Sequence, residues 1–309
     1  MRQSEISNQK SEIPRVPYRS PYSASTRFLR GNLHAHTCCG RFMDLAESGR
    51  IYAALNYDFL AVTDHNRTHH PGQVAHWQAE AGLIVVPGEE NGGTDHIIEL
   101  GVHDVADAPP AEPGRNYAER ARALREAGGF VYGCHPQEYP HGHENIRAGA
   151  DALHGLELFN GLREGRGCDE TRNLTLWDEL LTEGARLWGV AADDFHCQYV
   201  SPGHGWVMVQ VDEDAEPTCQ LIVDQLKAGA FYASTYPSFR RIGLDDGLLS
   251  VEADGRTQAV QVVGPGGEVL ERVEGHELSW RVAGNMSYFR VEAVSGVKRA
   301  WSQPFFREA

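Results

Sequence analysis

The chain has 309 residues, and 28 Lys and Arg against 43 Asp and Glu give a formal net charge of −15. This length corresponds to about two average domains, or to one barrel-sized domain with a smaller neighbour. The acid excess disfavours binding to long nucleic acids, whose non-specific affinity comes from Lys and Arg that neutralise phosphates. The sequence also contains 15 histidines, which is an unusually large number. Histidines and acids together are the ligands of hydrolytic metal sites, so this composition is compatible with metal chemistry.

The six cysteines show no Cys-x-x-Cys spacing and are too few for a disulfide scaffold. The polar, proline-bearing N-terminus lacks the apolar segment of a secretory signal, and no run of 18 apolar residues occurs. We therefore expect a cytoplasmic protein that does not enter a membrane. Nothing in the sequence indicates the oligomeric state.

Residues 1–27 carry three prolines and scattered apolar residues, which predicts a tail or strap. Residues 28–240 then alternate short apolar runs with amphipathic stretches. Continuous runs of Val, Leu and Phe predict strands that are buried on both faces. The runs are FLRGNLHAH, DFLAVTDH, LIVVPGEE, FVYGCHP, GLELFN, LWGVAADDFH and WVMVQV.

Helical spacing of apolar residues predicts helices over 116–127, 170–183 and 217–228, the last with Pro217 at its first position. Strands that alternate with helices imply a parallel sheet with crossovers. About seven such units are enough for an α/β barrel.

Residues 241–309 differ, because their segments alternate apolar and polar residues between Gly-rich turns. This pattern is typical of antiparallel hairpins. We expect a small β-sandwich-like module that carries no chemistry.

Nearly every apolar run of the barrel ends in a possible metal ligand. The ends of parallel strands meet at one mouth of a barrel, where catalytic groups of such folds lie. Two histidines at positions i and i+2 of a strand point to the same side and can reach one ion. A lone His-x-His is weak evidence, as His141 and His143 in a Pro/Gly-rich loop illustrate, but several strands ending alike make coincidence improbable.

The motifs GNLHAHT, AVTDHN, VPGEEN with the following His96, GCHP, LELFN and ADDFH occur in this order. Over residues 28–240 the chain thereby resembles the polymerase and histidinol phosphatase (PHP) family of metal-dependent phosphoesterases. The β-rich C-terminal segment resembles a subgroup that includes carbamate hydrolases. The resemblance implies a distorted (β/α)7 barrel with two or three divalent metal ions, Zn, Mn or Fe, at its mouth.

The resemblance also implies a role for each ligand. It makes His34 and His36 ligands of a first ion, Glu90 a bridge to a second ion held by His96 and His135, and Asp194 a ligand or bridge of the first. His65 and His196 match ligands of a third ion. The residues in these sentences, with Asp44, form the predicted metal-ligand set.

Several alternatives stay open. The family often has an acid or histidine just after the His-x-His motif, whereas the first acid here is Asp44. The third ion is therefore held by Asp44, held weakly or absent. Glu89 competes with Glu90, and Asp193 with Asp194, because each pair is adjacent. Thiolates bind zinc well, so the four cysteines beside the motif histidines are either packing residues or further ligands: Cys38, Cys39, Cys134 and Cys197.

We expect hydrolysis of a small phosphorylated substrate, a nucleotide or phosphodiester, by a hydroxide that bridges two ions. Arg41 is the expected phosphate-binding residue, and Arg67, Arg163 and Arg166 are the other candidates. Asp194, His65 and His196 complete the expected catalytic set, the two histidines assisting the leaving oxygen. The alternatives are a carbamate or ester hydrolase on the same metals and a metal-binding regulatory module without turnover.

Overall fold

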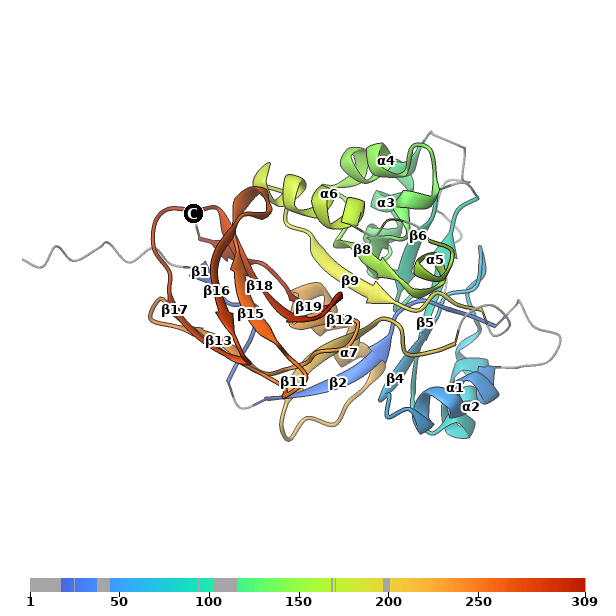
Figure 1. Cartoon of the computed structure of the whole chain (residues 1–309). Helices are drawn as coiled ribbons and strands as arrows, with labels where there is room; N and C mark the ends of the chain where they lie inside the picture. The colour runs from blue at the N-terminus through green and yellow to red at the C-terminus, as the bar shows by residue number, and fades with distance from the viewer. Residues whose placement is uncertain are drawn as a thin grey trace, which may run out of the picture.

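A computed structural model describes residues 18–24, 26–37, 45–93, 95–102, 116–167, 169, 171–196 and 201–308. An α/β part occupies one side of the molecule and a purely β part the other (Figure 1). Within the described residues, no helix combines the length and the apolar character that crossing a bilayer requires.

The elements of the α/β part follow one another as strand and helix. The strands are β2 (Thr26–Asn32), β3 (Ala35–His36), β4 (Phe59–Val62), β5 (Ile84–Asn91), β6 (Ile97–Leu100), β7 (Phe130–Gly133), β8 (Gly155–Asn160), β9 (Trp188–Ala192), β10 (Phe195–His196), β11 (Trp206–Asp212) and β12 (Phe231–Ser234). The helices are α1 (Leu45–Ala54), α2 (Pro71–Ala81), α3 (Tyr117–Glu126), α4 (Gly142–Gly149), α5 (Gly161–Gly165), α6 (Thr171–Thr182) and α7 (Cys219–Ala228), with a 3₁₀ turn η1 (Pro136–Glu138).

Strands β3 and β10 pair with each other, and the other strands form one curled stretch of sheet in the order β12-β11-β2-β4-β5-β6-β7-β8-β9. Pairing is parallel within β2-β4-β5 and within β7-β8-β9. However, β6 runs antiparallel to both β5 and β7, and β11 runs antiparallel to β2. The predicted mixed α/β class is confirmed, and the expectation of a uniformly parallel sheet is wrong. The curled sheet is a half-barrel, so a complete (β/α)7 barrel stays a prediction.

The apolar runs form strands because both of their faces are covered. Every residue of β4, β6, β7 and β8 is buried, whereas β14 alternates buried with more exposed positions. Side chains of β2, β4, β6, β7, β9, β11 and α7 share one apolar core. This core supports the strand ends that carry the histidines.

The helices α3, α6 and α7 lie where the sequence predicts them, within one or two residues. Pro217 is not the first helical residue of α7, because Thr218 is the N-cap and its hydroxyl accepts from the Leu221 N–H. The stretch 136–151, which we read as a loop, contains η1 and α4. Gly142 starts α4 where a Cβ would come 2.0 Å from the Pro136 carbonyl oxygen.

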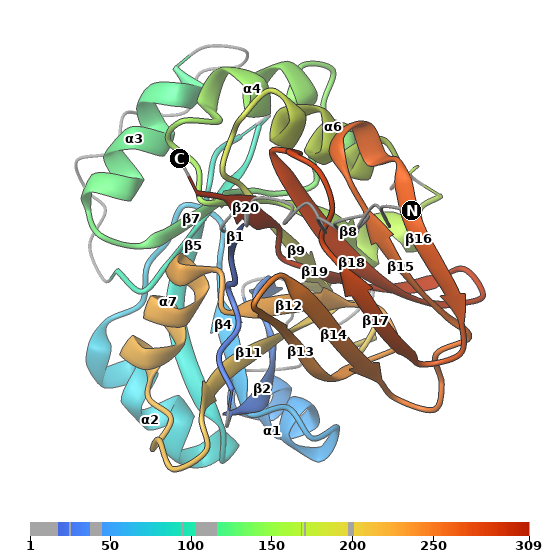
Figure 2. The same cartoon turned by 90° about the vertical axis from the view of Figure 1, so that its left-hand side faces the viewer.

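The C-terminal strands are antiparallel. They are β13 (Phe239–Asp245), β14 (Leu248–Ala253), β15 (Ala259–Val263), β16 (Val269–Glu274), β17 (Glu277–Arg281), β18 (Tyr288–Ser295), β19 (Lys298–Ser302) and β20 (Phe305–Arg307), with a 3₁₀ turn η2 (Pro265–Gly267). A three-stranded sheet, β13-β14-β17, faces the strands around β18 across a shared apolar core (Figure 2). Near the N-terminus, β1 (Tyr18–Arg19) pairs with β20.

The two parts of the chain share hydrogen bonds across the predicted domain boundary at residue 240. Strand β19 pairs with β12 and so continues the curled sheet. The Gln303 side chain binds the Gly189 backbone in β9 twice, donating to its carbonyl (2.8 Å) and accepting from its N–H (2.7 Å). The Tyr22 hydroxyl donates to the Phe231 carbonyl and accepts from the Gln303 N–H. One amide thus bridges from the C-terminal strands to the last strand of the half-barrel.

A buried ion pair makes a second junction. Arg290 on β18 donates from Nε and Nη2 to the two carboxylate oxygens of Asp178 on α6, at 2.9 and 2.8 Å. Its Nη1 donates to Glu292. The side chains of Arg290, Asp178 and Glu292 are all buried. If one of them is removed, water cannot take its place as a partner of the remaining charges.

We expect Arg290→Met to lower the free energy of unfolding by about 3–5 kcal/mol, since it leaves two buried carboxylates without their cation. Urea unfolding followed by circular dichroism measures the loss. The matched control is Arg240→Met, because Arg240 is exposed and makes a long ion pair, 3.7 Å, with the partly exposed Glu252. That change should cost at most about 1 kcal/mol. Equal losses in both variants would contradict the assignment.

Strand β6 also buries an acid on the side of the sheet remote from the histidines. Glu99 pairs in register with Glu89 of β5 and is fully buried. Gly129 leaves room for it, since a Cβ there would lie 1.9 Å from Oε1. Burial first, and the charge of Glu89 second, raise the pKa of Glu99 to about 9.

We expect Glu99→Gln to gain stability relative to the wild type as pH rises. Between the ordinary pKa of 4.5 and the folded-state pKa of about 9, the folded protein keeps a proton that the unfolded chain loses, so wild-type stability falls with rising pH. By pH 7 the pH-dependent difference should reach about 3 kcal/mol. Thermal unfolding at several pH values between 5 and 8 measures it, with the exposed Glu271→Gln as control. Parallel profiles for all three proteins would refute the prediction.

Candidate metal centre

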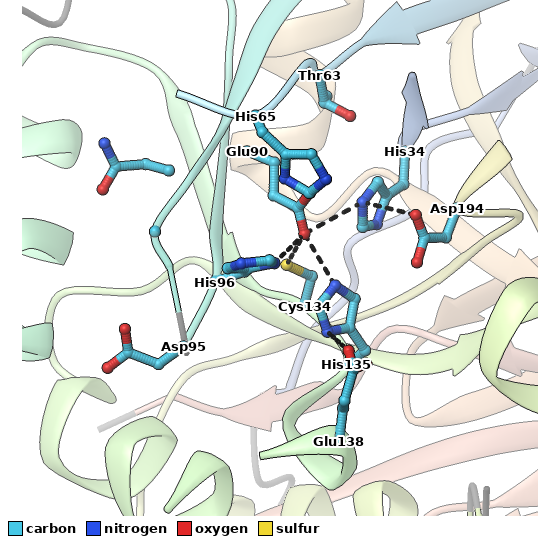
Figure 3. Close-up of polar contacts among 12 residues, drawn as sticks. His34, Thr63, His65, Glu90, Asp95, His96, Cys134, His135, Glu138 and Asp194 are labelled. Atoms are coloured by element: carbon cyan, nitrogen blue, oxygen red, sulfur yellow. Dashed lines mark hydrogen bonds and ion pairs between the residues drawn. The ribbon is translucent and has the colours of Figure 1, made fainter. Parts of the chain in front are cut away.

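Eight of the nine side chains of the predicted metal-ligand set lie at one end of the curled sheet. Figure 3 labels His34, His65, Glu90, His96, His135 and Asp194 among them. They follow β2, β4, β7 and β9, end β5, or precede β6. The antiparallel direction of β6 is what brings His96, just before its first residue, to the ends of the parallel strands. The eight are His34, His36, His65, Glu90, His96, His135, Asp194 and His196.

Glu90 occupies the centre of this group. Its Oε1 accepts from His96 Nδ1 (2.5 Å) and His135 Nε2 (2.8 Å). Its Oε2 lies 2.7 Å from His65 Nδ1 and 3.3 Å from His36 Nε2. Burial opposes the charge of this carboxylate, but His34 and the surrounding imidazole hydrogen bonds hold the pKa of Glu90 well below its usual range.

Asp194 closes the other side. Its Oδ1 lies 3.2 Å from His34 Nε2, 3.3 Å from His36 Nε2 and 3.2 Å from His196 Nδ1. A positive φ of 52° turns the backbone at Asp194, a conformation that Asp tolerates better than most residues. Strand β10 then pairs with β3, which sets His196 beside His36 with ring centroids 4.1 Å apart.

The adjacent acids point elsewhere. Asp193 accepts from the Tyr52 hydroxyl (2.8 Å) and from the N–H groups of Gly203, His204 and Gly205. Glu89 accepts from the Asn91 amide. Successive strand residues face opposite sides, so Glu90 of β5 reaches the histidines and Glu89 does not. Asp193 and Asp194 follow β9, and there the turn at Asp194 directs the second acid to the histidines.

A layer of polar side chains orients the imidazoles. Glu157 on β8 lies 3.0 Å from His34 Nδ1 and accepts from the His135 N–H (2.8 Å). The Asn160 amide donates to Glu157 and to Asp194. Such partners fix the ring orientation and tautomer of ligand histidines. Glu157 and Asn160 thus lie where they can orient the ligand side chains.

Around His135 the layer reaches towards solvent. Glu138 lies 3.2 Å from His135 Nδ1 and 2.6 Å from Nη2 of Arg163. That guanidinium nitrogen also lies 3.6 Å from Asp194 Oδ2. Of the arginines predicted to bind phosphate, Arg163 is thus one whose guanidinium lies beside the cluster.

The buried donors fit divalent cations better than they fit one another. Six of their atoms form no hydrogen bond among the described residues, and four of the six face one another within the cluster: His34 Nε2, His36 Nε2, Glu90 Oε2 and Asp194 Oδ1. Buried polar atoms are almost always paired, and lone pairs of imidazole and carboxylate that converge can be satisfied by a cation. Burial lowers the pKa of His36 to about 4, so its ring is neutral at pH 7, as a metal ligand must be.

Among the described residues, three donor groups have the spacing to hold an ion, and two of these groups share His36. Within each group one donor atom per residue lies within 4.8 Å of all the others. The groups are His34, His36 and Asp194; His36, His65 and His196; and Glu90, His96, Cys134 and His135.

Some predicted residues are not placed. Arg41, Asp44, Cys38, Cys39 and Cys197 lie outside the described residues. His143, of the weaker His-x-His pair, instead bonds Asn173 on α6 (3.0 Å) and takes no part in the cluster.

Two residues near the cluster escaped the sequence reasoning. The Tyr139 hydroxyl lies 3.1 Å from His96 Nδ1, and no pattern within its Pro/Gly-rich segment signals this. His69, which belongs to none of the predicted ligand motifs, is buried and its Nε2 bonds Asp64 (2.8 Å). Asp64 also accepts from the Thr37 N–H (2.6 Å). The Asp-His dipeptide after β4 thus has one member in the cluster and one that anchors the residue after His36.

No family model matches the chain, and neither does any curated protein. Among solved structures, the fold is similar to that of PsfC from Pseudomonas syringae PB-5123, at 15% identity over 64% of this chain and 88% of that chain (TM-score 0.44). It is also similar to an amidohydrolase from Chromobacterium violaceum with bound sulfate and no metal, at 17% identity over 63% and 96% (TM-score 0.41).

The more extensive likeness is to a two-domain protein from Bacteroides vulgatus ATCC 8482 that contains a predicted PHP-like metal-dependent phosphoesterase. The identity is 13%, and the alignment covers 95% of this chain and 98% of that chain with a TM-score of 0.51. The likeness therefore includes the C-terminal strands as well as the curled sheet. The chain shares its overall fold with a two-domain PHP-like protein, in agreement with the resemblance that its motifs indicate.

Proposed function

We propose that the protein is a metal-dependent hydrolase, most specifically a phosphoesterase that cleaves a small phosphorylated substrate. The observation that carries the proposal is the convergence of six imidazoles on two buried carboxylates, with four donor atoms that face one another lacking hydrogen bonds. The fold shared with a PHP-like protein supports it.

Two or three divalent ions, Zn, Mn or Fe, would be held by this cluster. His34, His36 and Asp194 would hold the first, Glu90 with His96 and His135 the second, and His65 and His196 a third. When bound, such ions lower the pKa of coordinated water towards neutrality and offset negative charge on the scissile group.

The chain's own residues position the reaction. Glu90 presents one carboxylate oxygen to each of two donor groups, which suits a bridge. Arg163 offers a nearly buried guanidinium beside Asp194, where it can bind a phosphate oxygen bidentately once Glu138 yields one of its contacts. Arg41 remains part of the proposal as a second clamp. His65, the more exposed of the imidazoles, and His196 can deliver a proton to the leaving oxygen.

An anionic substrate is compatible with the net charge of −15. Bound divalent ions would offset the acids of the mouth locally, so the protein as a whole can be acidic while its site attracts an anion. The substrate class, the absence of long nucleic acid and membrane partners, and the cytoplasmic location all stay predictions.

We expect His36→Ala and Asp194→Asn each to reduce turnover at least about 10³-fold, because each residue would supply a ligand of the first ion that the reaction needs. Elemental analysis of the same preparations should show less than the wild-type metal content. The control is His276→Ala, an exposed histidine of the β part, which should keep full turnover and metal. Unchanged turnover in both site variants would refute the metal centre.

We expect the metal-reconstituted protein to hydrolyse a nucleoside monophosphate or an aryl phosphodiester at least about tenfold faster than an aryl carbamate, because two charged centres and an arginine match a phosphoryl group better than a neutral carbonyl. Side-by-side kcat/KM values measure this preference. Faster carbamate turnover would replace the phosphoesterase by the carbamate hydrolase. Full metal content with no turnover of any substrate would favour the regulatory module.

A further inference from the structure

Cys134 is the one member of the three donor groups that the proposed metal assignments leave without a role. It follows β7 directly and is buried, and its Sγ lies within 4.8 Å of donor atoms of Glu90, His96 and His135. In Figure 3 the sulfur points to the same oxygen of Glu90 as the two imidazoles do. It lies on the opposite side of Glu90 from His65, whose partner is the other oxygen.

The crowding at this oxygen is the first argument for an ion. His96 Nδ1, His135 Nε2 and Cys134 Sγ all direct a hydrogen bond to Glu90 Oε1, at 2.5, 2.8 and 3.5 Å. His34 Nε2 is a further 3.5 Å neighbour of the same atom. A carboxylate oxygen has two lone pairs, so three donors exceed what it can accept. Four groups with lone pairs around one point are what a tetrahedral cation requires.

The spacing is the second argument. A zinc ion with bonds of about 2.3 Å to sulfur and about 2.0 Å to oxygen at tetrahedral angles separates these two ligand atoms by about 3.5 Å. The Sγ–Oε1 distance is 3.5 Å. The distance between the cysteine sulfur and the Glu90 oxygen therefore already matches that of two ligands of one zinc ion.

Resting on the proposed function, we propose that Cys134 is a thiolate ligand of the second ion, which makes this a Glu-His-Cys-His site. On binding, the thiol loses its proton to water and the sulfur binds the ion. Because thiolate is a soft donor, this ligand sets the metal preference of the site towards Zn²⁺ and away from Mn²⁺ and Mg²⁺. Neighbouring sites built from imidazole and carboxylate lack that bias.

The experiment replaces the native metal by Co²⁺ in the full-length protein. Sulfur-to-cobalt charge transfer gives a near-ultraviolet absorption that imidazole and carboxylate ligands do not produce. We expect this band in the wild type and its loss in Cys134→Ser, with cobalt still bound at the remaining sites. Zn²⁺ affinity should fall at least about tenfold in Cys134→Ser while Mn²⁺ affinity changes little.

Two controls separate Cys134 from the other thiols. The double variant Cys168→Ser and Cys219→Ser removes the two cysteines that neighbour no motif histidine, the second of which is partly exposed at the start of α7, and should retain the band. A variant with Cys38→Ser, Cys39→Ser and Cys197→Ser should also retain it. Loss of the band in this triple variant alone would overturn the proposal and assign the sulfur ligand to those segments.

Other outcomes are equally decisive. Bound cobalt without the band in the wild type overturns the thiolate ligand but leaves the proposed metal centre intact. No bound cobalt overturns both. If Cys134→Ser does not fold, ¹¹³Cd NMR of the wild type and of the triple variant replaces it. A strongly deshielded cadmium signal in both proteins then supports Cys134, and its absence from either overturns the assignment.

Discussion

The buried carboxylate of Glu90 is the constraint on which the site depends. A carboxylate in the protein interior is costly unless charged or hydrogen-bonding partners surround it. Here its partners come from four separate segments, after β2, β4 and β7 and before β6. The strand ends can therefore meet only in an arrangement that leaves neither Glu90 nor its imidazoles without partners, and a cation satisfies them better than the imidazoles alone.

A second set of side chains keeps these groups in position. Glu157 binds both a ring nitrogen after β2 and a backbone N–H after β7, so it ties two ligand segments together. Arg120 on α3 does the same for the turn before β6. It donates to Asn91 and to Asp95, on either side of that turn. Because Arg120 and Asp95 are buried, their hydrogen bonds hold His96 against the thermal motion expected of a loop.

The C-terminal strands contribute to the same framework although they carry none of the clustered histidines. Gln303 hydrogen-bonds β9, the strand that precedes Asp194, and Lys298 reaches Glu164 on α5 (2.9 Å). Helix α5 also carries Arg163. The β part thus supports one wall of the mouth, which gives a physical reason for the two parts to occur together.

Much of this could be read from the sequence. Continuous apolar runs that end in His, Asp or Glu predicted the strands, and the rule that strand ends meet predicted that these side chains converge. The resemblance carried by the order of the motifs added predicted metal-binding roles for His34, His36, Glu90 and Asp194. Periodicity could not show that β6 runs antiparallel, because a four-residue run buried on both faces reads the same in either direction.

Only the tertiary structure decided between neighbours. Which of Glu89 and Glu90, or of Asp193 and Asp194, faces the histidines depends on the pleat of the strand and on the turn at Asp194, and a shift of one residue would exchange them. The contacts of Cys134 with Glu90, of Tyr139 with His96 and of Gln303 with β9 join residues far apart in the chain. Local sequence specifies the strands and their ligands, whereas burial of charge in a shared space specifies which of those ligands meet.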